Sequence, residues 1–254
     1  MNIFFDSHVG KKRQNNEDNV KSILLGKQLY VLIVADGVGG EKKGEVASEL
    51  AITHIEQYLS ENMKDVNAAK GDKEKTIHLI KDAILRANYI IKELANSEEY
   101  YKMATTVVLA FIYKNQMLVA NVGDSRCYLL KRKKGQCHLE QITKDNTFVQ
   151  ELMDKGLITP EEAKTSRDKN TITRAVGAEY DLDIDIYELT LEKSDVVMLC
   201  SDGLTDMLEH SEMEEIMENV NIENMVENLI QKSLEKGGRD NITVLCAENC
   251  EVMK

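Results

Sequence analysis

Four strand-like segments follow one another between residues 105 and 142, and they constrain the fold more than any other part of the chain. Each is rich in aliphatic, β-branched or aromatic residues, and turn signals such as Lys114-Asn115 and Lys134-Gly135 separate them. Such short connections are typical of antiparallel pairing. We therefore expect an antiparallel meander formed by segments 105–113, 116–122, 127–131 and 136–142.

The rest of the chain alternates blocks of strands and helices. Strands are predicted at 20–25, 28–35, 183–191, 195–200 and 242–246, and the run QLYVLIVA at 28–35 is apolar enough to be buried. Apolar residues at steps of three and four predict long helices at 44–62 and 74–96. Shorter helices are expected at 147–155, 159–164, 212–218 and 222–235, and 68–71 is expected to be a connection. Because few βαβ units are visible, an α+β sandwich of antiparallel sheets with helices outside is favoured.

Length and charge narrow the function. The chain has 254 residues, 43% of them hydrophobic, which suits one domain or two small ones. The net charge of -12 argues against binding to nucleic acid, which requires a basic face. The same acidity is also unfavourable for an enzyme that acts on anionic phosphate groups.

The cellular compartment is constrained by what the sequence lacks. No apolar run approaches the ~18 residues that span a bilayer, and the first residues resemble neither a signal nor a transit peptide. The cysteines are odd in number, scattered and free of CxxC pairs, so a disulfide framework or thiolate zinc site is not expected. They are Cys127, Cys137, Cys200, Cys246 and Cys250. A soluble protein of the reducing cytoplasm, without membrane insertion, is predicted.

Five short acidic turns are spread along the chain near the ends of predicted strands. They are RQNNED (13–18), ADGVGG (35–40), NVGDSR (121–126), CSDG (200–203) and GGRDN (237–241). Any one of them alone is best interpreted as an ordinary turn. Together they offer the carboxylates that a pair of hard cations such as Mg²⁺ or Mn²⁺ requires. Spacing alone leaves open whether they converge.

The order and spacing of these motifs resemble the metal-dependent protein serine/threonine phosphatases of the PPM (PP2C-like) family, especially the small bacterial type. The resemblance runs from about Val9 to Val244. Its motifs are Gly10…Arg13…Asn16-Glu17-Asp18, Ala35-Asp36-Gly37-Val38-Gly39-Gly40…Gly44-Glu45, Ala104-Thr105-Thr106, Asn121-Val122-Gly123-Asp124-Ser125-Arg126, Thr173-Arg174-Ala175-Val176-Gly177, Ser201-Asp202-Gly203-Leu204 and Gly238-Arg239-Asp240-Asn241-Ile242-Thr243. It implies one four-layer αββα domain over 1–254, with a mobile flap at about 143–177.

The resemblance also implies a role for each motif residue. Asp36 is expected to bridge two Mn²⁺ or Mg²⁺ ions, with the Gly37 carbonyl as a further ligand. Asp202 and Asp240 are expected on the first ion and Glu17 on the second. Asp124 is expected to hold a third, weaker ion that Asp202 shares. Supporting contacts are expected from Asp18 and Asn241, and the substrate phosphate is expected to be bound by Arg13.

These roles agree with the chemistry of phosphate ester hydrolysis. Water that bridges two divalent ions is a nucleophile near neutral pH and can attack phosphorus directly. The Arg13 guanidinium matches the geometry of phosphate oxygens. No covalent phosphoenzyme is needed, so the buried cysteines are expected to be structural.

Some positions depart from the family pattern. Animal relatives often carry His where this chain has Val38, and valine cannot donate a proton to the leaving group. Relatives often have His near Asn146 and a His-Pro pair near Ser166-Arg167. This chain has neither, so the resemblance does not say which flap residues contact the substrate. His8 is expected to be structural rather than to line the site. The cluster at Lys131-Arg132-Lys133-Lys134 is expected to cap a hairpin in solvent.

The predicted function is therefore hydrolysis of phosphoserine and phosphothreonine in phosphoproteins, opposing a bacterial Ser/Thr kinase that is itself among the partners. A catalytically inactive regulator that binds phosphoproteins or a kinase is a weaker alternative, because the metal-ligand acids are all present. A phosphatase of a partner-switching pathway would use the same site and stays open. The family resemblance suggests a monomer.

Overall fold

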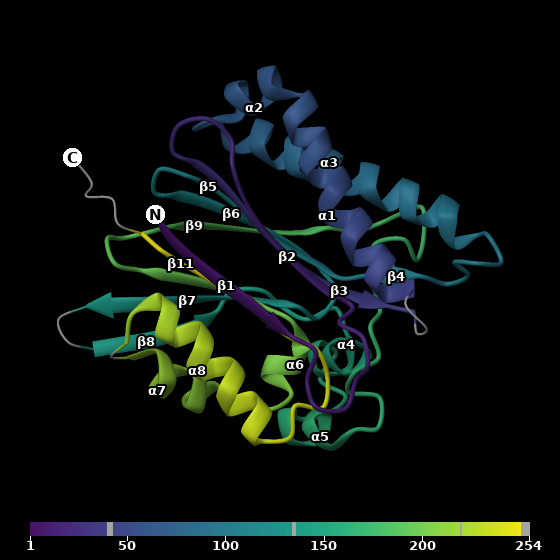
Figure 1. Ribbon diagram of the computed structural model, residues 1–254, viewed down its shortest axis with the longest axis vertical. Coiled ribbons are helices and arrows are strands. Elements are labelled where there is room, and N and C mark those ends of the chain that lie inside the picture. Colours follow the sequence, from purple (N-terminus) through teal and green to yellow (C-terminus); the bar gives the residue numbers. More distant parts are fainter. Residues whose placement is uncertain (40–42, 134–135, 219, 250–254) are drawn as a thin grey trace.

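Two antiparallel sheets are stacked face to face in the computed structural model, which describes residues 1–39, 43–133, 136–218 and 220–249 (Figure 1). The first sheet has the order β1 (Asn2–His8), β11 (Ile242–Glu248), β10 (Val196–Cys200), β7 (Arg126–Lys133) and β8 (Gln136–Gln141). The second has the order β2 (Asp18–Leu24), β3 (Leu29–Val38), β5 (Val107–Tyr113), β6 (Gln116–Val122) and β9 (Asp185–Thr190). The short β4 (Ala104–Thr105) pairs with the end of β3.

Helices cover the outer face of each sheet. One side carries α1 (Lys43–Glu61), α2 (Met63–Ala69) and α3 (Lys73–Ala95), and the other carries α6 (Asp202–Thr205), α7 (His210–Glu218) and α8 (Ile222–Glu235). The segment between β8 and β9 contains α4 (Phe148–Asp154) and α5 (Pro160–Thr165). Thr159 caps α5 through a capping box with Glu162. The layers thus follow the predicted αββα order.

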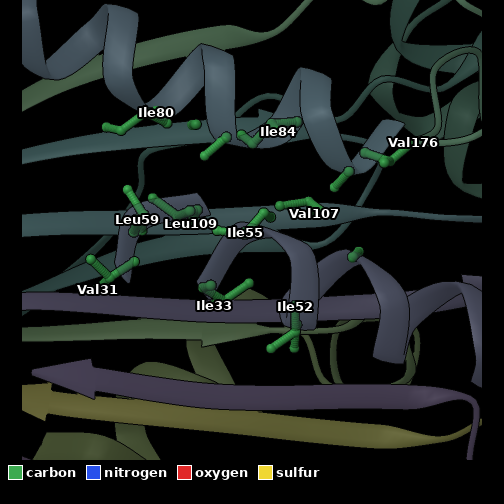
Figure 2. Packing of buried hydrophobic residues seen from close by; sticks show 14 of the residues in the cluster. Val31, Ile33, Ile52, Ile55, Leu59, Ile80, Ile84, Val107, Leu109 and Val176 are labelled. Atoms are coloured by element: carbon green, nitrogen blue, oxygen red, sulfur yellow. The ribbon is translucent and has the colours of Figure 1, made fainter. Parts of the chain in front are cut away.

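Three apolar cores separate the four layers, because successive strand residues point to opposite faces. On β3, Val31 and Ile33 face the helices, whereas Leu32 and Val34 face the other sheet. Figure 2 shows Val31, Ile33 and Leu109 beneath the apolar sides of α1 and α3. On the opposite side, β10 and β11 pack against α7 and α8. The buried strands are therefore apolar on both faces.

The predicted single meander is wrong. The structure has two hairpins in different sheets, β5–β6 and β7–β8, and the chain changes sheets between Val122 and Arg126. Gly123 lies at this crossing with a φ of +105°, and a Cβ there would stand 2.6 Å from Thr106 Cγ2. Splitting the hairpins lets each bury one face in the core between the sheets and the other against helices.

Three elements have no counterpart among the predicted segments: β1, α2 and the four-residue α6. The edge strand β1 pairs only with β11, and its mixed polar and apolar residues hide the strand pattern. Helix α2 overlaps the connection predicted at 68–71, and its N-cap residue Asn62 makes no side-chain capping bond. Arg132 also departs from prediction, because it donates to the carbonyl oxygens of Met217 and Val220 instead of standing in solvent.

Gly40, Lys134, Gly135 and Cys250 of the predicted motifs and turns lie outside the described residues. Within the described ranges, none of the helices combines the length and apolarity needed to cross a bilayer.

The packing of β5 beneath the helices yields a stability prediction. Leu109 is fully buried, so Leu109→Ala should lower the free energy of unfolding by about 2–5 kcal/mol through lost burial and a residual cavity. Leu24 is 60% exposed at the end of β2, and Leu24→Ala should change it by less than about 0.5 kcal/mol. Urea unfolding monitored by circular dichroism measures both. Equal losses in the two variants would contradict the assigned core.

Candidate active site

The acidic turns meet at one end of the β-sandwich. Asp18 and Asp36 stand directly opposite each other in the β2–β3 register. Asp202 opens α6 directly after β10, and Asp240 immediately precedes Asn241 and β11. The shared cleft has a volume of about 290 Å³ and is lined by Arg13, Glu17, Asp36, Gly37, Val38, Gly39, Asp124, Asn170, Ile172, Asp202, Asp240 and Asn241. Residues far apart in the sequence thus form one acidic pocket.

The backbone of Asp36 is clamped by two threonines. Thr106 Oγ1 accepts a hydrogen bond of 2.9 Å from the Asp36 amide, and Thr105 Oγ1 donates over 2.9 Å to the Asp36 carbonyl. Gly37 follows in close contact with the start of α1, where a Cβ would lie 2.1 Å from the Gly44 carbonyl oxygen. The Ala104-Thr105-Thr106 and glycine motifs therefore fix the strand end that carries Asp36.

Asp18 joins the two sheets beneath the cleft. Its Oδ2 accepts hydrogen bonds of 2.7 Å from both Ser201 Oγ and Thr243 Oγ1, which lie on the opposite sheet. Its Oδ1 is buried without a hydrogen-bond partner. Burial raises the pKa of Asp18 to about 6, although the two hydroxyl donors oppose the shift.

The other carboxylates raise one another's pKa values. Loss of hydration, followed by the charges of Asp18 and Asp202, raises the pKa of Asp36 well above its ordinary value. Burial and then Asp124 do the same for the pKa of Asp202. Burial followed by the charge of Asp145 raises the pKa of Asp124 to about 7. The cluster therefore holds more negative charge than its own surroundings neutralise.

Arg13 and Asn241 organise the loop before β2. Arg13 Nη2 lies 2.8 Å from Asp240 Oδ2, an ion pair in which the Arg13 side chain is 52% exposed. Asn241 accepts a hydrogen bond from the Glu17 amide and donates to the carbonyls of Val9 and Asn15. Asn241 thus places Glu17 at the cleft, and Arg13 keeps its guanidinium beside the acids.

The donor set fits hard divalent cations. Within the described ranges, no three His, Cys, Asp or Glu side chains already surround one point as a complete metal site. The orphaned Asp18 Oδ1, the mutually repelling carboxylates and the all-oxygen chemistry nevertheless match the requirements of Mg²⁺ or Mn²⁺. A cation at this cleft would relieve a repulsion that Arg13 alone leaves largely unbalanced.

A family model described as protein phosphatase 2C matches residues 6–237. The chain belongs to this family. The predicted resemblance and enzyme class, a protein serine/threonine phosphatase, are confirmed by the membership and by the relatives that share the fold.

Relatives match over nearly the whole chain. The serine/threonine phosphatase stp of Listeria monocytogenes is 38% identical over 250 residues, covering 98% of this chain and 96% of that protein. The solved Streptococcus agalactiae serine/threonine phosphatase has 30% identity and a TM-score of 0.87, with 96% of this chain and 98% of that one covered. The catalytic domain of PstP, solved with two manganese ions, has 32% identity and a TM-score of 0.76, with 98% of both chains covered. These likenesses confirm the predicted fold class.

Most predicted site residues of this family member lie at the cleft. Arg13, Glu17, Asp36, Gly37, Asp124, Asp202, Asp240 and Asn241 line it, and Asp18 lies buried below. Val38 stands 40% exposed on the cleft wall. Because its side chain is aliphatic, this position offers no proton donor. His8 accepts a hydrogen bond from the Gly10 amide and is absent from the cleft wall, in agreement with the structural interpretation.

Other contributors had no distinct signal in the sequence. Asn170 and Ile172 reach the cleft from the flap, where the polar sequence around them resembles an ordinary loop. Ser201 and Thr243 belong to the family motifs, and their role is visible only in the structure, where both donate hydrogen bonds to Asp18. The buried cysteines agree with the structural role expected for them. Burial raises the pKa values of the Cys127, Cys200 and Cys246 thiols, which keeps them protonated and unreactive.

The raised pKa values predict how the metal-free protein responds to pH. Asp18 and Asp124 titrate near 6 and 7 when folded, above about 3.9 for an unfolded aspartate. The folded state therefore binds extra protons, and the stability they contribute is complete below about pH 4 and is lost as pH rises through 6 and 7. Urea unfolding in EDTA should give a lower free energy of unfolding at pH 8 than at pH 5. Asp124→Asn should show a smaller decline, and identical declines in both proteins would contradict the assignment.

Proposed function

We propose that this chain removes phosphate from phosphoserine and phosphothreonine in proteins, with two Mn²⁺ or Mg²⁺ ions. The supporting observation is the convergence of five carboxylate-bearing motifs and one arginine on a single cleft. Oxygen ligands from separate strand ends suit a two-ion centre, and the neighbouring guanidinium suits a phosphate dianion. The proposal accounts for both features at once, the acids as metal ligands and the arginine as the phosphate-binding group.

The proposed ligand assignment follows the position of each group. Asp36 would be shared by the two ions and the Gly37 carbonyl would add a ligand, while Asp202 and Asp240 would hold the first ion and Glu17 the second. Asp18 and Asn241 orient these groups through the hydrogen bonds described above. When bound, the ions supply an activated water and neutralise phosphate charge.

Arg13 has the position and freedom to bind substrate. Its exposed guanidinium is held at the cleft by Asp240 and has a planar fork that matches two phosphate oxygens. The hydrogen bond and charge of Asp240 keep the pKa of Arg13 raised, so it stays cationic. We assign Arg13 to gripping the phosphate and holding the phosphorus in line for attack.

We also propose the substrates, the cellular compartment and the oligomeric state of the enzyme. The substrates would be phosphoproteins, including a Ser/Thr kinase that the enzyme opposes, and the chain would act as a cytoplasmic monomer formed by one domain over 1–254. The inactive-regulator alternative is disfavoured, because every proposed ligand acid is present at the cleft. A partner-switching role would use the same groups.

Removing the bridging carboxylate tests the proposed reaction. Asp36→Asn keeps the shape of the side chain but removes the charge shared by both ions, so turnover should fall by at least about a hundredfold. Hydrolysis of p-nitrophenyl phosphate and of a phosphothreonine peptide, with and without Mn²⁺, measures the effect.

Asp65→Asn is the matched control, because Asp65 is exposed on α2 and does not line the cleft. It should retain wild-type, metal-dependent turnover. Unchanged activity in Asp36→Asn would overturn the assignment of the centre, and metal-independent activity in the wild type would overturn the proposed chemistry.

The third ion is tested by changing Asp124, on the β6–β7 turn. Asp124→Ala should lower turnover while two tightly bound Mn²⁺ ions remain, because the proposed assignment gives Asp124 no part in holding the first two ions. Isothermal titration calorimetry counts the ions, and the phosphatase assay gives the rate. Loss of a tight site in this variant would contradict a separate third-ion role.

A further inference from the structure

Two loops meet beside the acidic cleft. Figure 1 shows the β1–β2 loop, residues 9–17, next to the α8–β11 loop, residues 236–241. The Lys11 amide donates a 2.7 Å hydrogen bond to the Gly238 carbonyl, and the Asn241 side chain donates to two carbonyl oxygens of the β1–β2 loop. These loops thus form one connected surface, which we call the cleft rim.

The cleft rim has an excess of cations, although the chain as a whole is acidic. Its cations are Lys11, Lys12, Arg13, Lys236 and Arg239. Its acids are Glu17 and Asp240, and both line the cleft. In the whole chain, 44 acidic residues outnumber 32 Lys and Arg. The rim is therefore a local reversal of charge beside a site proposed to bind phosphate.

Two of the rim cations already have an acidic partner. Arg13 pairs with Asp240, and Lys236 pairs with Glu212. The other three are exposed, and their side chains form no ion pair or hydrogen bond with the residues that the structure describes. They are Lys11, Lys12 and Arg239. Their charges are available to a ligand without the loss of an existing contact.

These three side chains extend from backbone positions next to the phosphate-binding arginine and its partner. Lys12 directly precedes Arg13, and Arg239 directly precedes Asp240. An extended peptide advances about 3.3 Å per residue, so groups one to three residues from the phosphorylated side chain lie within about 10 Å of it along the peptide. An anionic group at such a position can therefore reach the rim while its neighbour's phosphate is bound at Arg13.

Unpaired cations on the surface suit an anionic group that lies beside the reacting phosphate. Contacts between exposed charges are individually weak, so one lysine alone would give little preference. Phosphate oxygens and carboxylates both accept charge-assisted hydrogen bonds from Lys and Arg, and three cations on one rim can act on the same group. The rest of the acidic surface repels such a segment, which concentrates the attraction at the rim.

We propose that Lys11, Lys12 and Arg239 form a subsite for a second anionic group, next to the site of the reacting phosphate. The enzyme then prefers phosphoproteins in which a second phosphate or a run of acidic side chains lies near the phosphorylated residue. This inference rests on the proposed phosphatase function and specifies its substrate class.

Peptide preference tests the subsite on the wild-type enzyme loaded with Mn²⁺. Three phosphothreonine peptides of equal length are compared, flanked by alanines, by glutamates, or by a phosphonate analogue of phosphoserine that cannot be hydrolysed. KM should be about fivefold to tenfold lower with an anionic flank than with alanines, the sum of several weak exposed contacts. The larger of the two preferences identifies carboxylates or a second phosphate as the ligand. Equal KM values for all three peptides would refute the subsite.

Charge removal at the rim tests which residues cause the preference. The triple variant Lys11→Gln, Lys12→Gln and Arg239→Gln should raise KM for the anionic peptides about fivefold to tenfold and KM for the alanine peptide less than about twofold, with kcat retained. Equal increases for all three peptides would contradict the subsite, since they would indicate a general effect on phosphate binding. If this variant fails to fold, the wild-type preference still decides the proposal.

The matched control replaces three exposed lysines elsewhere with glutamine: Lys27, Lys64 and Lys193. Lys27 joins β2 to β3 and Lys193 joins β9 to β10, at the ends of β3 and β10 away from Asp36 and Asp202, and Lys64 lies on α2. None of the three lines the cleft. This variant loses the same total charge and should keep the wild-type preference. A matching loss of preference would show that net charge, and not the rim, is the cause.

A binding measurement separates failure of the subsite from failure of the proposed function. Fluorescent peptides with a phosphonate analogue of phosphothreonine report affinity by anisotropy without turnover. If the wild type hydrolyses nothing but binds the glutamate-flanked peptide more tightly than the alanine one, and the triple variant does not, the function fails and the subsite stands. Hydrolysis of all peptides without preference gives the reverse result.

An anionic membrane is the competing ligand for an exposed basic rim. Sedimentation with vesicles of phosphatidylserine and phosphatidylcholine measures it for the wild type and the triple variant. We expect no binding that depends on the rim, because the rest of the surface is acidic. Rim-dependent vesicle binding without a peptide preference would assign the rim to a membrane surface and overturn the proposal.

Discussion

The constraint on which this structure depends is the repulsion among carboxylates gathered at one end of the β-sandwich. Burial, followed by the charges of Asp18 and Asp202, raises the pKa of Asp36. Burial, followed by the charges of Asp124 and Asp240, raises the pKa of Asp202, and the guanidinium of Arg13 is paired with Asp240. Such a cluster opposes folding at neutral pH, so other parts of the molecule must offset it. The three apolar cores do this, because their continuous strands hold the acid-bearing ends in place.

Neutral hydroxyl groups hold Asp18 and the backbone of Asp36, whereas Asp240 is paired with the charged Arg13. Ser201 and Thr243 reach from one sheet to Asp18 on the other, and Thr105 with Thr106 fixes the backbone of Asp36. Hydroxyl groups position the carboxylates without cancelling their charge. The arrangement is costly for the protein alone and well suited to a phosphatase whose acids must attract divalent ions.

The sequence predicted the longer helices and most strands, because apolar periodicity reports burial directly. It failed where the result depends on distant partners: the switch of sheets at Gly123, and the edge strand β1 that pairs only with β11. The candidate site was reached through motif spacing, since periodicity says nothing about convergence. Asn170 was missed because its place on the cleft wall depends on how the flap packs against the rest of the domain.

The acidic balance of the chain is compatible with phosphate chemistry because the charges are unevenly placed. Without ions, the cleft would repel a phosphate dianion, and Arg13 would stay engaged with Asp240. Ions bound by these acids would invert the local potential and compete for Asp240, which would leave the guanidinium available to substrate. Metal binding and substrate binding would then be coupled through one carboxylate. The acidity that argues against a phosphate substrate would therefore admit it only to the metal-loaded enzyme.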